Sequence, residues 1–97
     1  MRYASDYVLL NADGTPAEDD GKDATALEGL RRALITDTKQ FSADQKAKRF
    51  ALWSKLGDSW AEGEFELDAG ELATALEAIE IYPTLVYGQL AAFLNQK

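Results

Sequence analysis

The sequence contains neither cysteine nor histidine, and these two absences exclude most of the common site chemistries. Without cysteine the chain forms no disulfide and offers no thiolate as a metal ligand or a nucleophile. Without histidine, acid–base catalysis would need a carboxylate pair, a lysine or a tyrosine held in a pocket. Glycine-rich phosphate loops and nucleophile elbows are also missing from the sequence. We therefore expect a protein that is not an enzyme and holds no cofactor.

Long apolar runs are absent as well. The first apolar run covers only residues 8–10, which is too short for the core of a signal peptide. No segment approaches the ~20 consecutive apolar residues of a membrane span. We expect a cytoplasmic protein that does not enter the membrane.

The remaining composition is that of one folded domain. The chain has 97 residues, of which 46% are hydrophobic and 10% aromatic, unlike the composition of disordered chains. A chain of this length removes about 64% of its extended surface from water when it folds. We expect a single compact domain over residues 1–97.

The net charge of −7 is distributed unevenly. Residues 1–21 carry five acids and one base, residues 22–56 carry four acids and eight bases, and residues 57–97 carry eight acids and one base. The three segments therefore sum to −4, +4 and −7. An acidic balance opposes direct binding to nucleic acid or membranes, whereas the separation of charge suits protein partners.

Local signals predict an α+β fold that is mostly helical. An Asp-Gly turn favours a short N-terminal β-hairpin that pairs residues 7–10 with 15–18, followed by a solvated acidic loop. Capping patterns that begin at Thr25, Ser42 and Asp68 predict three helix starts, and a Tyr-Pro dipeptide separates the last two helices. The expected elements are four helices, at about 25–37, 42–57, 68–82 and 83–95, and a short strand near 64–67.

The second predicted helix has an apolar and a basic face. Its expected core residues are Ala47, Phe50, Ala51, Trp53 and Leu56. Its basic residues, Lys46, Lys48, Arg49 and Lys55, are expected to form a solvated face; a phosphate- or acid-binding patch is the alternative. Gly57 is expected to end the helix in the left-handed conformation.

An acidic surface is predicted where the sequence alternates strictly. In an extended segment Phe65 and Leu67 would face the core. The outward carboxylates would be Glu62, Glu64, Glu66 and Asp68. These four charges span about 20 Å, whereas duplex DNA carries roughly twelve charges over that length. Mimicry of DNA, by which the chain would inhibit a host nucleic-acid-binding protein, is therefore an alternative function rather than the first one.

The loop that begins at Asp58 resembles a calcium-binding EF-hand loop, with Gly63 in the sixth position. Its third position is Trp60 and its twelfth is Ala69. The bidentate glutamate normally found at the twelfth position is therefore missing. We expect no metal site, and a degenerate EF-hand-like calcium protein is the weaker alternative.

The last predicted helix is uncharged from Ile81 to Gln96. One stripe, Val86, Leu90, Phe93 and Leu94, suits the core. The other stripe is the candidate interaction surface, made of Tyr82, Leu85, Gly88, Gln89 and Ala92. We expect a protein partner, or a second copy in a homodimer, to cover this surface; the alternative is that the N-terminal hairpin folds over it.

Several stretches together resemble a family of short proteins encoded in tailed-phage and prophage genomes. They are "VLLNADGTP", "ATALEGLRRAL", "KAKRFALWSKL", "EFELDAGELATALEAI" and "YPTLVYGQLAAFL". The uncharged final helix departs from the family pattern, in which this helix often carries more charge. The resemblance implies a bacteriophage origin and action in the bacterial host cytoplasm. Together with the residues, it leads us to expect a small acidic protein-interaction module that acts as an adaptor, an assembly protein or a host-factor-binding protein.

Overall fold

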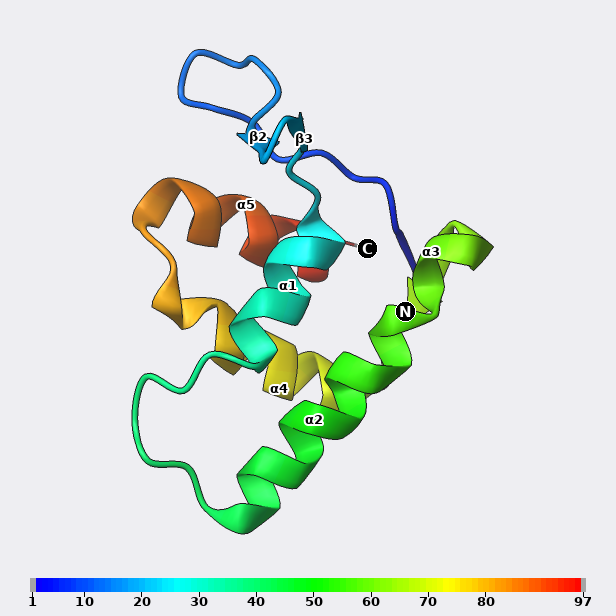
Figure 1. The fold of residues 1–97 in the computed structure, drawn as a ribbon, viewed down its shortest axis with the longest axis vertical. Coiled ribbons are helices and arrows are strands. Elements are labelled where there is room, and N and C mark those ends of the chain that lie inside the picture. The colour runs from blue at the N-terminus through cyan, green and yellow to red at the C-terminus, as the bar shows by residue number, and fades with distance from the viewer. Residues whose placement is uncertain (1, 97) are drawn as a thin grey trace.

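The computed structural model describes residues 2–96, apart from the side chains of residues 60 and 61, and confirms a mostly helical α+β fold. The elements are β1 (Arg2–Ala4), β2 (Glu18–Asp19), β3 (Lys22–Asp23), α1 (Ala26–Leu34), α2 (Ala43–Gly57), the single turn α3 (Ser59–Glu62), β4 (Glu64–Glu66), α4 (Ala69–Ala78), the 3-10 turn η1 (Ile79–Ile81) and α5 (Thr84–Leu94). Helix α1 lies in the middle of the molecule and contacts α2, α4 and α5 (Figure 1).

The helices begin where the capping patterns predict. Ser42 and Gln45 form a complete capping box at the start of α2, and Asp68 and Glu71 form another at the start of α4. At α1 the side chain of Thr25 accepts a hydrogen bond from the backbone of Glu28. Each box satisfies backbone donors that the first helical turn leaves unpaired, so the helix starts depend on local sequence.

The N-terminal hairpin differs from the prediction. Between residues 7–10 and 15–18 the pairing is limited to one bridge, Leu10 to Pro16, with the backbone of Leu9 accepting from Ala17. The backbone N–H of Leu9 donates instead to the carbonyl of Ala24. The segment around Leu9 therefore bonds to two different parts of the chain, near residues 17 and 24, and does not form a regular hairpin with either. The regular hairpin is β2–β3, formed by the acidic run that was expected to be a solvated loop.

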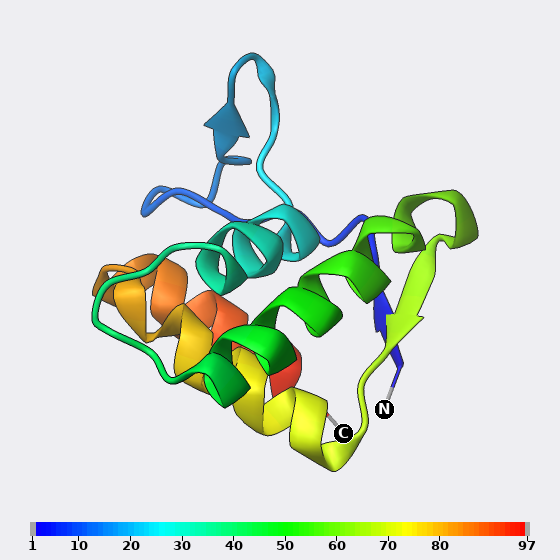
Figure 2. The ribbon, with the colours of Figure 1, turned by 60° about the horizontal axis from the view of Figure 1, so that its bottom comes forward.

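Strand β4 pairs antiparallel with β1, with Tyr3 opposite Phe65 (Figure 2). The alternation is confirmed, because Phe65 and Leu67 are buried and the flanking acids are exposed. The predicted strand near 64–67 therefore exists, and its partner is β1, at the N-terminal end of the described chain.

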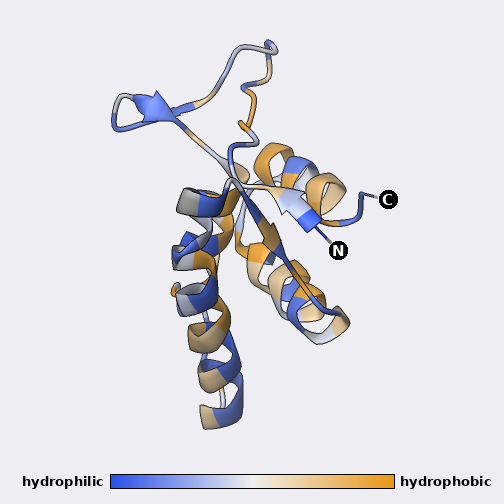
Figure 3. Cartoon of the chain, turned by 90° about the vertical axis from the view of Figure 1, so that its right-hand side faces the viewer, coloured by the Kyte–Doolittle hydropathy of each residue, from blue (hydrophilic) through white to orange (hydrophobic). Residues whose placement is uncertain are grey.

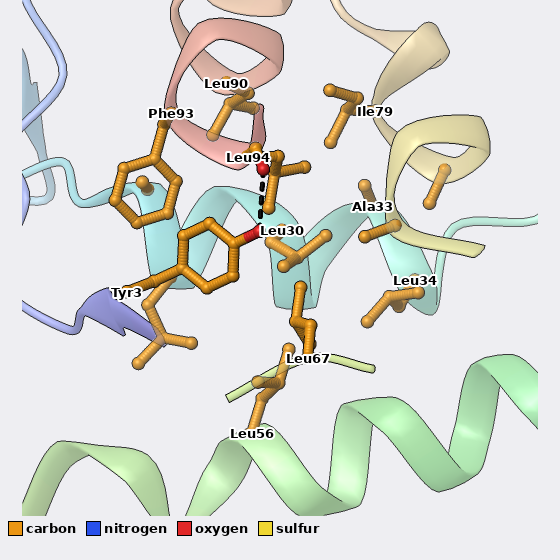
Figure 4. Packing of buried hydrophobic residues seen from close by; sticks show 14 of the residues in the cluster. Tyr3, Leu30, Ala33, Leu34, Leu56, Leu67, Ile79, Leu90, Phe93 and Leu94 are labelled. Atoms are coloured by element: carbon orange, nitrogen blue, oxygen red, sulfur yellow. Dashed lines mark hydrogen bonds between the residues drawn. The ribbon is translucent and has the colours of Figure 1, made fainter. Parts of the chain in front are cut away.

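The core gathers residues from β1, β4 and all the longer helices (Figure 4). Tyr3 is buried between Phe65 and Phe93, with ring centroids 5.2 Å away in both cases, and its hydroxyl donates to the carbonyl of Leu94 at 2.6 Å. Tyr3 thereby connects β1 to the end of α5. An aromatic side chain with a satisfied polar tip contributes both buried area and orientation.

Helix α2 is rotated relative to the prediction. Phe50 was expected in the core but is 62% exposed, whereas Leu52 and Arg49 are buried. The prediction that Gly57 is left-handed is also wrong, because α2 includes it and the left-handed glycine in this region is Gly63. Gly57 instead makes room: a Cβ there would lie 2.9 Å from the guanidinium of Arg31.

Candidate functional site

The predicted surface on α5 is partly used by the chain itself. The hydroxyl of Tyr82 donates to the carbonyl of Gly29, and burial raises the pKa of Tyr82 above its usual range. The side chain of Gln89 accepts from the backbone N–H of Leu10 at 2.7 Å and donates to its carbonyl at 2.9 Å. The N-terminal segment therefore covers this part of the stripe.

The other members of that surface remain open. Leu85 is 47% exposed, and Gly88 and Ala92 are also exposed. Beside them Leu10 is 44% exposed. The predicted surface is thus divided: Tyr82 and Gln89 make contacts within the chain, whereas Leu85, Gly88 and Ala92 are exposed.

The acidic surface is exposed, but its charge is reduced by pairing. Arg2 contacts Glu66 at 3.1 Å and Glu64 at 3.3 Å, and the hydrogen bond and charge of Glu66 raise the pKa of Arg2. Asp68 accepts the backbone N–H of Glu71 at 2.7 Å as the helix cap. Of the four carboxylates, two therefore have a cation beside them and one is used in capping, which lowers the likeness to a DNA backbone.

The prediction that all four basic residues of α2 are solvated is wrong for Arg49, which is buried. Its Nη2 donates to the carbonyls of Ala33 at 2.8 Å and Thr36 at 3.3 Å, beside the C-terminus of α1. Its guanidinium also lies over the ring of Phe41, 4.3 Å from the centroid. Lys55 pairs with Glu71 and Lys48 with Asp44, and Lys46 and Lys48 are exposed.

A hollow of about 640 Å³ lies between α2 and α4, which run apart below the β1–β4 pair (Figure 3). Its lining includes Lys48 and Leu52 on α2 and Ala73 and Glu77 on α4. Because both basic and acidic side chains line this hollow, its charge favours neither an anionic nor a cationic ligand. Nothing in this hollow reproduces a nucleophile, a general base and an oxyanion site in mutual contact.

The Asp58 loop folds as a connection between α2 and β4. Asp58 has right-handed helical backbone angles and ends α2, α3 follows as one turn, and Gly63 with φ of 76° turns the chain into β4. Among the residues that the structure describes, no three acidic side chains converge as ligands for a metal ion.

The structure adds a surface that sequence reasoning missed, here named the aromatic patch: Arg31, Ile35, Phe50 and Trp53. Phe50 is 62% exposed, and the centroid of its ring lies 5.7 Å from that of Trp53. The guanidinium of Arg31 lies 4.6 Å from the centroid of Trp53, and Ile35 is 55% exposed. The sequence prediction places Phe50 and Trp53 in the core because they are apolar and recur at helical spacing. The pair Leu52 and Leu56, four positions apart, is the pattern that would have indicated the buried face of α2.

A hollow of about 410 Å³ adjoins the aromatic patch. Ile35, Trp53 and Arg31 line it together with residues of the β2–β3 hairpin. Across it Arg32 contacts Asp19 at 2.6 Å, and this hydrogen bond raises the pKa of Arg32. The hairpin is thereby held against α1 and forms one wall of the hollow.

Comparison of the chain with protein-family models, with curated proteins and with solved structures finds no match. Over residues 2–96, no helix has both the length and the apolar character needed to cross a membrane.

Proposed function

We propose that the chain is a small, non-catalytic protein-binding module and that the aromatic patch is its binding surface. The observation that carries the proposal is the exposure of Phe50 on a helix whose other large apolar side chains, Leu52, Trp53 and Leu56, pack into or against the core. Contiguous exposed apolar groups rimmed by polar residues are typical of protein-binding sites. Aromatic residues and arginine are also the residues that most often dominate interface energies.

The patch is already ordered before any partner binds. Arg31 Nε donates to the carbonyl of Trp53 at 3.3 Å while its guanidinium covers the indole ring. Gly57 supplies the space that this arrangement needs. Because these side chains lose little conformational freedom on binding, more of the contact energy is retained as affinity.

The surroundings of the patch suit a partner protein better than a nucleic acid. The adjoining hollow combines Arg31 and Arg32 with Glu28, Asp19 and Asp20, so it does not present one sign of charge. Ile35 and Trp53 in the lining of this hollow suit an apolar anchor side chain from the partner. The resemblance to phage-encoded proteins extends the proposal to an adaptor, assembly or host-factor-binding role in a bacterial cytoplasm. Duplex-DNA mimicry is less favoured because Arg2 partly neutralises the acidic surface.

The proposal is tested by two matched surface variants, Phe50→Ser and Leu85→Ser, each removing an exposed apolar side chain. The immobilised protein is used to capture partners from a bacterial lysate, and the affinity of each purified prey is then measured for the three chains. We expect Phe50→Ser to weaken binding at least tenfold, or by about 1.4 kcal/mol, and Leu85→Ser to leave it unchanged.

The other outcomes identify the alternatives. A loss confined to Leu85→Ser would place the interface on α5 instead. A nucleic-acid-binding prey that duplex DNA displaces, and that neither variant affects, would favour mimicry. If no prey binds above background, the proposed function is contradicted.

A further inference from the structure

Strand β4 presents an outer edge of the β1–β4 pair. The backbone N–H of Ser5 donates to the carbonyl of Gly63 at 2.9 Å, which fixes the phase of the antiparallel ladder. Hydrogen-bonded and non-hydrogen-bonded pairs alternate along such a ladder. Tyr3 and Phe65 are therefore a bonded pair, and the N–H and C=O groups of Glu64 and Glu66 point away from β1.

The two outer edges of the pair differ. On β1 the carbonyl of Arg2 accepts a hydrogen bond from the side chain of Gln96 at 3.1 Å. On β4, among the groups that the structure describes, none from outside the pair bonds to the backbone of Glu64 or Glu66. Figure 2 shows β4 at the margin of the molecule, beside β1. Unpaired groups of this kind form a template for an additional strand.

The space and the charge beside β4 define what could add to it. A hollow of about 450 Å³ is bounded by Lys55, Asp58 and Ser59 near the end of α2 and by residues of β4. Its lining carries four acids, Asp58, Glu62, Glu64 and Glu66, against the two bases Arg2 and Lys55. A net charge of −2 at this edge favours a basic strand.

Charge also argues against a second copy of the chain at this edge. In a twofold antiparallel pairing of two β4 strands, Glu64 of one copy would face Glu66 of the other. Like charges directly opposite each other destabilise a sheet. The incoming strand should therefore carry lysine or arginine opposite Glu64 and Glu66. Because Phe65 faces the core and is only 4% exposed, an apolar residue suits the position between them.

We propose that the edge of β4 is a strand-addition site for an extended segment of a partner protein with the pattern basic–apolar–basic. The backbone of Glu64 and Glu66 would supply two donors and two acceptors, and the carboxylates would select the basic side chains. This site is separate from the aromatic patch, so it does not depend on the proposed function: Phe50→Ser should leave peptide binding at β4 unchanged.

The probe for this site is a capped synthetic peptide that alternates lysine and valine, compared with the same peptide methylated on its backbone nitrogens. Both carry the same charge, but the methylated form lacks the donors that a strand needs. The readout is amide hydrogen exchange of the ¹⁵N-labelled chain. At a peptide concentration ten times Kd, we expect exchange at Glu64 and Glu66 to slow by about tenfold. The methylated peptide should have no such effect.

Two chain variants provide matched controls for charge. Glu64→Gln with Glu66→Gln removes two charges at the edge, and Glu77→Gln with Glu80→Gln removes two exposed charges elsewhere. We expect only the first pair to weaken binding of the unmodified peptide. Equal effects of the two peptides, equal effects of the two variant pairs, or unchanged exchange at Glu64 and Glu66 with millimolar peptide would each overturn the proposal.

Discussion

Replacement of Arg49 by methionine should destabilise the fold, although the sequence places this residue among exposed basic neighbours. Arg49 is 5% exposed, and its Nη2 donates to the carbonyls of Ala33 and Thr36. Methionine keeps the apolar stem and loses the guanidinium. The substitution therefore isolates the hydrogen bonds, the contact with Phe41 and the favourable position of a cation at the C-terminus of α1.

The magnitude follows from the contacts that are lost. Hydrogen bonds involving a charged group contribute ~1.5–3 kcal/mol, and a cation over an aromatic ring contributes ~0.5–2 kcal/mol. The buried Nε of Arg49 has no hydrogen-bond partner, so its removal offsets part of the loss. We expect a net decrease of about 2–3 kcal/mol in the free energy of unfolding. In a domain of this size that corresponds to a Tm lower by roughly 10–20 °C.

The assay is urea unfolding followed by circular dichroism, with Lys48→Met as the control from the adjacent position. Lys48 is exposed and pairs with Asp44 at 3.2 Å within the same helix, an interaction of ~0.3–0.5 kcal/mol. Arg49→Lys should give an intermediate loss, because lysine keeps the charge but not the planar fork. If Arg49→Met and Lys48→Met agree to within about 0.5 kcal/mol, the structural role assigned to Arg49 is wrong.

Three further predictions concern the core, the helix caps and calcium. Burial raises the pKa of Tyr3, so its contribution is complete below the unfolded-state pKa of about 10 and is lost as pH rises above it. The Tm of Tyr3→Phe should therefore fall less steeply between about pH 9 and 11 than that of the unmodified chain, and parallel slopes would contradict this. Asp68→Ala removes the cap of α4 and should cost about 1 kcal/mol in urea unfolding, whereas Asp58→Ala, which removes no capping bond, should cost less than about 0.5 kcal/mol. The Tm should be the same in about 1 mM calcium and in chelator, since an ion bound only by the folded state would raise it.

The α5 stripe was predicted from its lack of charge, but its division between two roles was not. Leu90, Phe93 and Leu94 are buried as the helical periodicity indicates. Gln89 looked equally suited to a partner, yet it bonds both backbone groups of Leu10. Leu10 lies 79 positions from Gln89 in the sequence, and a local sequence pattern does not predict a contact between residues so far apart. The same limit applies to β4, whose partner β1 lies at the start of the chain, with Tyr3 opposite Phe65.

Features that depend on neighbours three or four positions apart, or on strict alternation, are predictable from the sequence. The capping pairs at Ser42 and Asp68 locate two helix starts because donor and acceptor lie within one turn. Phe65 is buried because side chains alternate across a strand whatever its partner.

The choice of which face of α2 is buried depends on tertiary packing. Phe50 and Leu52 are both apolar and lie on different sides of that helix, so periodicity permits either to be buried. Packing against α1 selects Leu52 and places Arg49 against the carbonyls of Ala33 and Thr36. Phe50 is left exposed beside Trp53. The physical reason is that the rotation of a helix about its axis is set by the surface it packs against, and that surface comes from distant parts of the chain.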